Sequence, residues 1–90
     1  MQKRIILKIY GRVQGVFFRD SSRRKAKELN LSGWARNELD GTVQIVAEGE
    51  EGELRELIKW CRNGLHHGKV EEMNIEWVNP TGEFNGFLIL

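Results

Sequence analysis

Some segments of the chain space their apolar residues as a strand does and others as a helix does. The order of these segments restricts the fold more than any other feature of the sequence. Residues 4–10 and 70–78 place apolar side chains at every second position, which is the spacing of a half-buried strand. Residues 50–63 place them at helical spacing, so one face of a helix is expected to be buried. That face consists of Leu54, Leu57, Ile58 and Cys61.

The segments between these elements predict a second helix and a hairpin. Residues 21–30 contain good helix formers, and either Ser21 or Ser22 is expected to cap that helix. Residues 33–49 read as two short strands with an Asp-Gly pair between them. Because Asp-Gly supplies the positive φ angles of a tight hairpin turn, we expect the two strands to pair.

The predicted order of elements is β-α-β-β-α-β, and residues 84–90 add a short C-terminal strand. This order is typical of the ferredoxin-like split β-α-β fold, an α+β architecture in which an antiparallel sheet has both helices packed on one face. Ninety residues suffice for one such domain, so residues 1–90 are expected to be a single domain. A single cysteine cannot form an intramolecular disulfide, so core packing must hold the fold.

Charge is distributed unevenly, although the net charge is only +1. Residues 1–30 carry nine Lys and Arg against two Asp and Glu, whereas residues 31–90 carry five against eleven. The basic first third favours an anionic ligand. The N-terminus lacks the apolar stretch of a signal peptide and no run is long enough to span a bilayer, so we expect a cytoplasmic protein with no membrane partner.

The stretch "GRVQGVFFR", residues 11–19, joins the first strand to the first helix. Backbone N–H groups and the macrodipole make the N-terminus of a helix a favourable place for an anion. Gly15 allows the loop to curl so that its amides form a nest, and Arg19 could hold two phosphate oxygens. The same glycines could instead only turn the chain, with Arg19 solvated. Neither G-x-x-x-x-G-K-[ST] nor G-x-G-x-x-G occurs, so no nucleotide site is predicted.

"GWARNELDGTV", residues 33–43, follows this stretch after one helix, and the two motifs at this separation resemble the acylphosphatase family over essentially the whole chain. The resemblance implies hydrolysis of acyl phosphates to a carboxylate and inorganic phosphate, without cofactor or metal. It assigns binding of the phosphoryl group to Arg19 and orientation of the attacking water to Asn37. It places the phosphate-binding loop at Val13, Gln14, Gly15, Val16, Phe17 and Phe18.

One loop departs from the family pattern. The family usually carries one or two prolines before the fourth strand, whereas this chain has Leu65, His66 and His67 there. Neither implied catalytic position lies in this loop. Two adjacent histidines without a third ligand are more often solvated than metal-bound, and Cys61 on the buried stripe is expected to be an inert core residue.

Two other classes of function remain open from the residues alone. The basic run "RRKAK", residues 23–27, could serve RNA binding on a ferredoxin-like scaffold, and a sensing module of the same topology is a third alternative. The aromatics of the RNA-recognition signature are missing from "TVQIVAEG", so no nucleic-acid partner is expected. We expect a monomer with an acyl phosphate substrate. Trp34, Trp60 and Trp77 are more often core or half-buried packing than base-stacking platforms, although Trp34 is near enough to Asn37 in sequence that it could line the mouth of its site.

Overall fold

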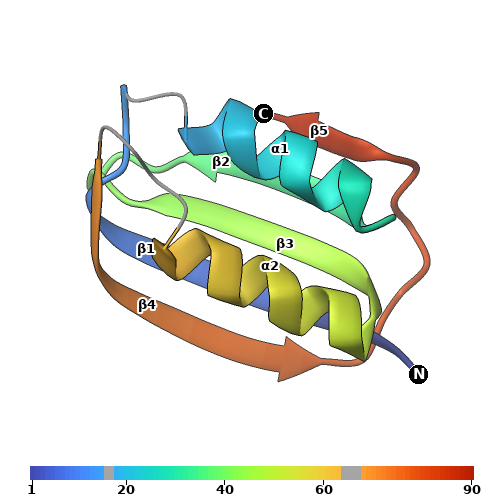
Figure 1. Cartoon of the computed structure of the whole chain (residues 1–90). Coiled ribbons are helices and arrows are strands. Elements are labelled where there is room, and N and C mark those ends of the chain that lie inside the picture. The colour runs from blue at the N-terminus through green and yellow to red at the C-terminus, as the bar shows by residue number, and fades with distance from the viewer. Residues whose placement is uncertain (16–17, 64–67) are drawn as a thin grey trace.

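The computed structural model describes residues 1–15, 18–63 and 68–90. Both helices lie on one face of the sheet (Figure 1), and the order of elements is the predicted one, so the ferredoxin-like split β-α-β fold is confirmed. The elements are β1 (Gln2–Arg12), α1 (Phe18–Glu28), β2 (Ser32–Asn37), β3 (Val43–Glu50), α2 (Glu51–Asn63), β4 (Lys69–Val78) and β5 (Phe87–Ile89).

The strands lie in the order β4-β1-β3-β2-β5. The four strands of the split β-α-β unit pair antiparallel, as predicted. The C-terminal strand corrects the prediction of an antiparallel sheet, because β5 pairs parallel to β2 and makes the sheet mixed. After β4 the chain crosses one end of the sheet to the opposite edge (Figure 1) and enters the sheet from that end, so β5 runs opposite to β4 and alongside β2.

Alternate residues of the central strands point towards the helices and build the core. Ile5, Leu7 and Ile9 of β1 are completely buried there. Burial raises the pKa of the Cys61 thiol to about 12, so this cysteine is a core residue, as predicted, and does not supply a thiolate. The whole predicted stripe of α2 is buried: Leu54, Leu57, Ile58 and Cys61.

Helix α1 begins at Phe18, so the prediction that Ser21 or Ser22 caps it was wrong. Ser22 is buried within the helix, where its hydroxyl donates to the carbonyl oxygens of Phe18 (2.8 Å) and Arg19 (3.0 Å). Phe18 is 1% exposed, and its ring stacks on that of Trp60 in α2 with centroids 6.0 Å apart. Core packing of Phe18 therefore starts the helix earlier and places Arg19 in its first turn.

The connection between β2 and β3 is longer than the predicted tight Asp-Gly turn and runs from Glu38 to Thr42. The Glu38 N–H donates to the carbonyl oxygen of Thr42 (2.9 Å), and Asp40 accepts from the Thr42 amide (3.0 Å) and hydroxyl (2.6 Å). Hydrogen bonds from Thr42 and Lys8 hold the pKa of the Asp40 carboxyl well below its usual range. The connection is thus closed by side chains directly after Asn37, the last residue of β2.

Candidate functional site

Two glycines shape the loop between β1 and α1 for different reasons. Gly11 has a φ of 126°, and a Cβ there would collide with the carbonyl oxygen of Lys69 in β4. The register between β1 and β4 shifts at this point, between Tyr10 and Gly11. Gly15 has a φ of 73° with open space around it, so only its backbone conformation favours glycine. The chain therefore curls at Gly15, as predicted.

A cavity of about 220 Å³ lies at the N-terminus of α1. Arg19 stands in the first turn of this helix, where backbone amides and the macrodipole favour an anion. Several residues of the predicted phosphate loop therefore meet at one cavity, whereas Val16 and Phe17 of that loop lie outside the described residues. The cavity is lined by Val13, Gly15, Phe18, Arg19, Asp20 and Ile89.

The Arg19 guanidinium is weakly engaged. Among the described residues its hydrogen bond is a long one, in which Nη1 donates to the carbonyl oxygen of Leu90 over 3.4 Å. Its carboxylate neighbour Asp20 is instead paired with Arg23 (2.7 Å) and Arg24 (3.0 Å) on the same helix. A guanidinium has five N–H donors, so Arg19 keeps donors available for an anionic ligand.

The side chain of Gln14 joins the loop to the second motif. Its Nε2 donates to the carbonyl oxygens of Glu38 (2.8 Å) and Thr42 (2.9 Å), the two ends of the β2–β3 connection. Because Asn37 directly precedes Glu38, the two sequence motifs meet at the same end of the sheet.

The Asn37 side chain carries a buried hydrogen-bond acceptor. It shares the helix-covered face of the sheet with the buried Ala35, two positions earlier in β2. Its Oδ1 is buried and has no hydrogen-bond partner within residues 1–15, 18–63 and 68–90. Buried amide oxygens rarely lack a hydrogen-bond partner, so a water or a ligand is the natural donor to this one.

Trp34, singled out in the sequence, lies away from this site. Trp34 lies three positions before Asn37 and so faces the other side of the sheet, where its ring packs 4.7 Å from the Arg36 guanidinium carbon. Trp34 is therefore a half-buried packing residue, and the alternative that it lines the mouth is not supported. The histidines His66 and His67 lie outside the described residues.

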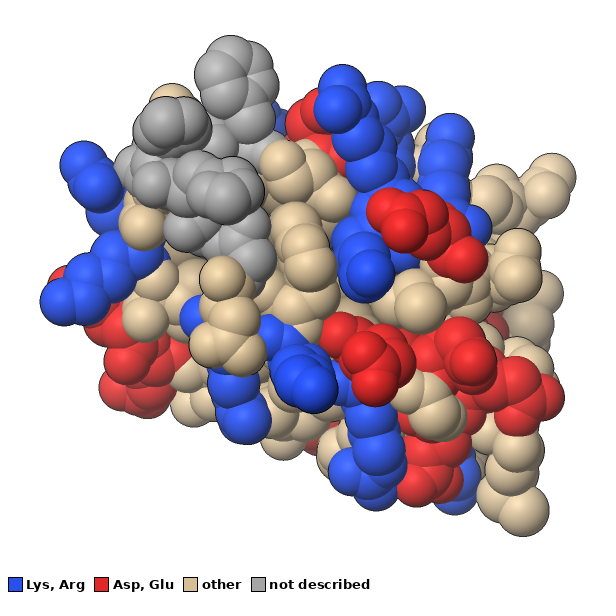
Figure 2. Space-filling view, viewed as in Figure 1, with Lys and Arg blue, Asp and Glu red and all other residues tan. Residues whose placement is uncertain are grey.

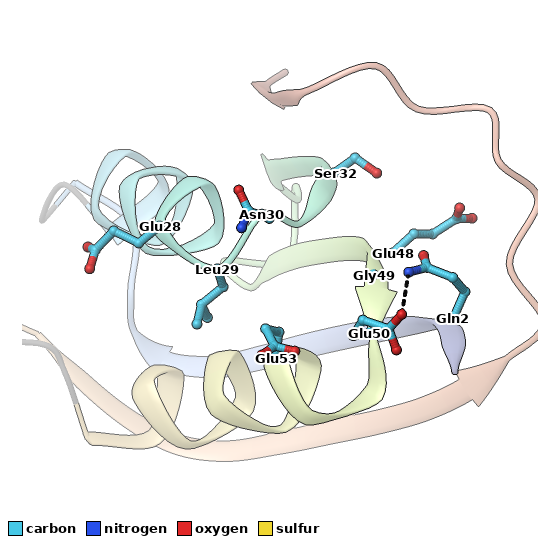
Figure 3. Close-up of a pocket in the computed structure, with 9 residues that line it drawn as sticks. All are labelled: Gln2, Glu28, Leu29, Asn30, Ser32, Glu48, Gly49, Glu50 and Glu53. Atoms are coloured by element: carbon cyan, nitrogen blue, oxygen red, sulfur yellow. Dashed lines mark hydrogen bonds between the residues drawn. The ribbon is translucent and has the colours of Figure 1, made fainter.

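A second cavity, of about 470 Å³, has the opposite electrostatic character (Figure 3). Glu28, Glu48, Glu50 and Glu53 contribute to its lining, so it disfavours a phosphate. On the face that carries the helices, Lys and Arg gather over α1, and Asp and Glu gather over the start of α2 (Figure 2). The cavity beside Arg19 is therefore the better anion site.

Within the described part of the chain, no group of three His, Cys, Asp or Glu side chains is arranged to hold a metal ion. In the same part, no helix has the length and apolar character needed to cross a membrane.

The fold defines a ferredoxin-like domain, and a cavity whose lining suits an anion lies between its first strand and first helix. The acylphosphatase family model matches residues 5–89. The acylphosphatase of Roseiflexus sp. is 48% identical over 82 residues, which cover 91% of this chain and 88% of that protein. The chain therefore belongs to the acylphosphatase family, and it is a hydrolase of acyl phosphates.

Solved structures agree with this assignment. The acylphosphatase from Bacillus subtilis superposes with a TM-score of 0.94 at 32% identity, covering 100% of this chain and 99% of that one. The acylphosphatase from Coxiella burnetii superposes with a TM-score of 0.92 at 36% identity, covering 99% and 93%. The likeness thus extends over the whole domain and includes the C-terminal strand.

Sequence reasoning missed two features of the site. The bridging role of the Gln14 side chain depends on carbonyl groups 24 and 28 residues away, which no local pattern reveals. Ile89 could have been suspected, because alternation in a terminal strand puts Phe87 and Ile89 on the same face.

Proposed function

We propose that residues 1–90 act as one catalytic domain, in which Arg19 and the backbone amides of residues 13–18 bind the phosphoryl group of the acyl phosphate. Asn37 orients the water that attacks phosphorus. The observation that carries this proposal is the bridge from Gln14 to Glu38 and Thr42, because it holds the loop against the residues that follow Asn37. The buried Oδ1 of Asn37, which has no partner among the described residues, supports its role as an acceptor for water.

Hydrolysis of an acyl phosphate requires few catalytic groups besides the loop amides, Arg19 and Asn37. As the water oxygen bonds to phosphorus, the phosphorus–oxygen bond to the acyl group breaks and its electron pair leaves on a carboxylate. The conjugate acid of that carboxylate has a pKa of about 4, so no protein acid must protonate it. A phosphoryl oxygen of the substrate accepts the water's proton.

Phosphoryl transfer depends mainly on positioning and on neutralising charge at the equatorial oxygens. In our proposal the Arg19 guanidinium and the loop amides neutralise that charge, without cofactor or metal. The weak engagement of Arg19 supports this role, because its donors need not be withdrawn from a strong partner.

We further propose a cytoplasmic monomer that acts on a small molecule and binds no nucleic acid. Asp20 supports the last point, because it pairs with both Arg23 and Arg24 and so compensates part of the basic run that RNA would require.

The direct test is phosphate release from acetyl phosphate and benzoyl phosphate, measured above the spontaneous rate and in excess chelator. We expect turnover to persist in chelator and to be inhibited competitively by inorganic phosphate. Loss of turnover with chelator, restored by a divalent cation, would contradict the metal-free mechanism.

A sugar phosphate provides the matched control substrate. Its alkoxide leaving group needs protonation that this site does not supply, so we expect its hydrolysis to be far slower. Comparable rates for the sugar phosphate and benzoyl phosphate would mean that an unrecognised acid operates.

A further inference from the structure

The cavity beside Arg19 has an apolar wall that is open to solvent. Of the three apolar residues that line it, Val13 and Phe18 are each 1% exposed, so their side chains offer almost no surface to a ligand. Ile89 of β5 is 38% exposed. Among the described residues, the apolar surface that a molecule in this cavity can touch therefore belongs mainly to Ile89.

The register of β5 determines which way Ile89 faces. Ile89 pairs with Ala35 of the parallel neighbour β2, and both lie on the sheet face that the helices cover. Asn37 lies on this face two positions further along β2. Leu88 pairs with Trp34 and faces the other side. Ile89 therefore shares its face with Asn37 and its cavity with Arg19.

An acyl phosphate has an anionic phosphoryl part and an acyl part, and the cavity offers a matching surface for each. Loop amides and Arg19 suit the phosphoryl oxygens. A carboxylate or ammonium group placed against Ile89 would lose hydration without gaining a partner. The volume of about 220 Å³ is below the roughly 300 to 1,000 Å³ of pockets for drug-sized ligands, so the acyl part must be compact.

We propose that Ile89 is a specificity-determining residue that contacts the acyl group. It favours compact, uncharged, apolar acyl groups over those that carry a second charge. This inference rests on the proposed function, because it requires the phosphoryl group to bind at Arg19.

The test compares acetyl, butyryl and benzoyl phosphate in the wild type, Ile89→Ala and Leu88→Ala. One methylene in an enclosed pocket changes kcat/KM by about tenfold or more, and Ile89 forms an open wall, so we expect a smaller effect. Ile89→Ala should lower kcat/KM for butyryl and benzoyl phosphate about fivefold relative to acetyl phosphate. Leu88→Ala, a change on the same strand but the other face, should leave these ratios unchanged.

Two further measurements separate contact from a general structural effect. The inhibition constant of inorganic phosphate should be unchanged in Ile89→Ala, because phosphate has no acyl part. Ile89→Val retains the branched side chain and strand preference, and it should shift the substrate ratios in the same direction by about twofold. Damage to the fold would instead lower the rates of all three substrates together.

The outcomes distinguish this inference from the proposed function. If the wild type hydrolyses all three substrates and the ratios are unchanged in both Ile89 variants, the contact with the acyl group is disproved and the proposed function stands. If the wild type hydrolyses none of them, the proposed function fails and the inference fails with it.

Discussion

The two ends of the sheet differ in how fully their polar side chains are hydrogen-bonded. At one end the Glu48 carboxylate is 5% exposed and accepts hydrogen bonds from the Thr81 amide (2.8 Å), the Gly82 amide (3.0 Å) and Arg4 Nε (2.7 Å). Arg4 also pairs with Glu83. This closed cluster ties the segment after β4 to β1 and β3, and every charge in it has a partner.

At the other end Gln14, Thr42 and Asp40 are hydrogen-bonded, but two polar side chains of the candidate site lack a strong partner within the described residues. Arg19 makes a long hydrogen bond to Leu90, and Asn37 Oδ1 has no partner in the described part of the chain. Buried polar groups without partners cost stability, whereas donors already positioned for developing charge lower the barrier of a reaction. The difference fits our proposal that one end stabilises the fold and the other binds the substrate.

Arg19→Ala should have the largest effect and should act on activity alone. We expect kcat/KM for benzoyl phosphate to fall more than about a hundredfold, a loss of about 3 kcal/mol, because the phosphoryl charge loses its main partner. Phosphate inhibition should weaken as well. The free energy of unfolding, measured in urea, should change by less than about 1 kcal/mol.

Arg62→Ala, at the last turn of α2, is the matched loss of charge and should leave both properties unchanged. Near-normal turnover in Arg19→Ala would remove this arginine from the mechanism.

Asn37→Ala, at the same end of the sheet, should lower the catalytic rate without weakening phosphate binding. We expect kcat to fall about a hundredfold because the attacking water loses its orientation, while the inhibition constant of phosphate stays nearly the same. Asn74→Ala is the control, since Asn74 donates to the Tyr10 hydroxyl at an exposed position. A defect of Asn37→Ala confined to phosphate affinity would contradict the role in orienting water.

Glu48→Ala should show the reverse behaviour at the closed end. Its removal leaves the amides of Thr81 and Gly82 without their acceptor, although Arg4 can still pair with Glu83. We expect the free energy of unfolding to fall by about 2 kcal/mol, which lowers Tm by roughly 10 °C, with little change in kcat below the transition.

Glu50→Ala is the control for this change, because Glu50 pairs with the N-terminal amine at the surface, and this substitution should cost much less stability than Glu48→Ala. Equal losses of stability in the two variants would show that the closed cluster stabilises the fold no more than a surface ion pair does.

The smallest expected effect is a pH dependence of stability that arises at the closed end. Burial by itself would raise the pKa of Glu48, but hydrogen bonds from Thr81, Gly82 and Arg4 outweigh it and lower the pKa below the ordinary value of 4.5. The unfolded chain therefore takes up this proton first as the pH falls. The contribution of Glu48 is present above about pH 4.5 and is lost as the pH falls through the lower pKa of the folded state.

Urea unfolding at pH 7, 5 and 3 measures this contribution. Wild type should lose more stability on acidification than Glu48→Gln, and parallel curves would contradict the assignment. The pKa of Glu50 is also lowered, but Glu50 is present in both proteins and its effect cancels in the difference.

Features of the fold that depend on neighbouring residues were predictable from sequence, and those that depend on distant contacts were not. The stripe of α2 follows from local spacing alone. The start of α1 was missed because Phe18 packs on Trp60, some forty residues away, and this packing outweighs the capping preference of Ser22. The parallel pairing of Gly33 with Phe87 joins residues more than half the chain apart, so no local pattern predicts it.

The same limit applies to the two ends of the sheet. Arg19 and Asn37 were identified through family motifs, and their roles stay predictions until the variants are measured. No sequence pattern predicts the closed cluster, because Arg4 and Glu48 are 44 residues apart and each resembles an ordinary charged residue of a strand. Only the register of β1 against β3 brings these two side chains opposite one another.

The order of strands in the sheet also determines when the growing chain can fold. β1 is synthesised first, yet both of its neighbours come much later, since Gln2 pairs with Glu50 and Arg4 pairs with Val78. At about 5 to 20 residues per second, several seconds separate the emergence of β1 from that of β4. During this time its unpaired edges expose backbone N–H and C=O groups with which other nascent chains could pair. Lys3, Arg4 and Lys8 interrupt that strand with charge, and we expect them to keep it soluble until its partners arrive.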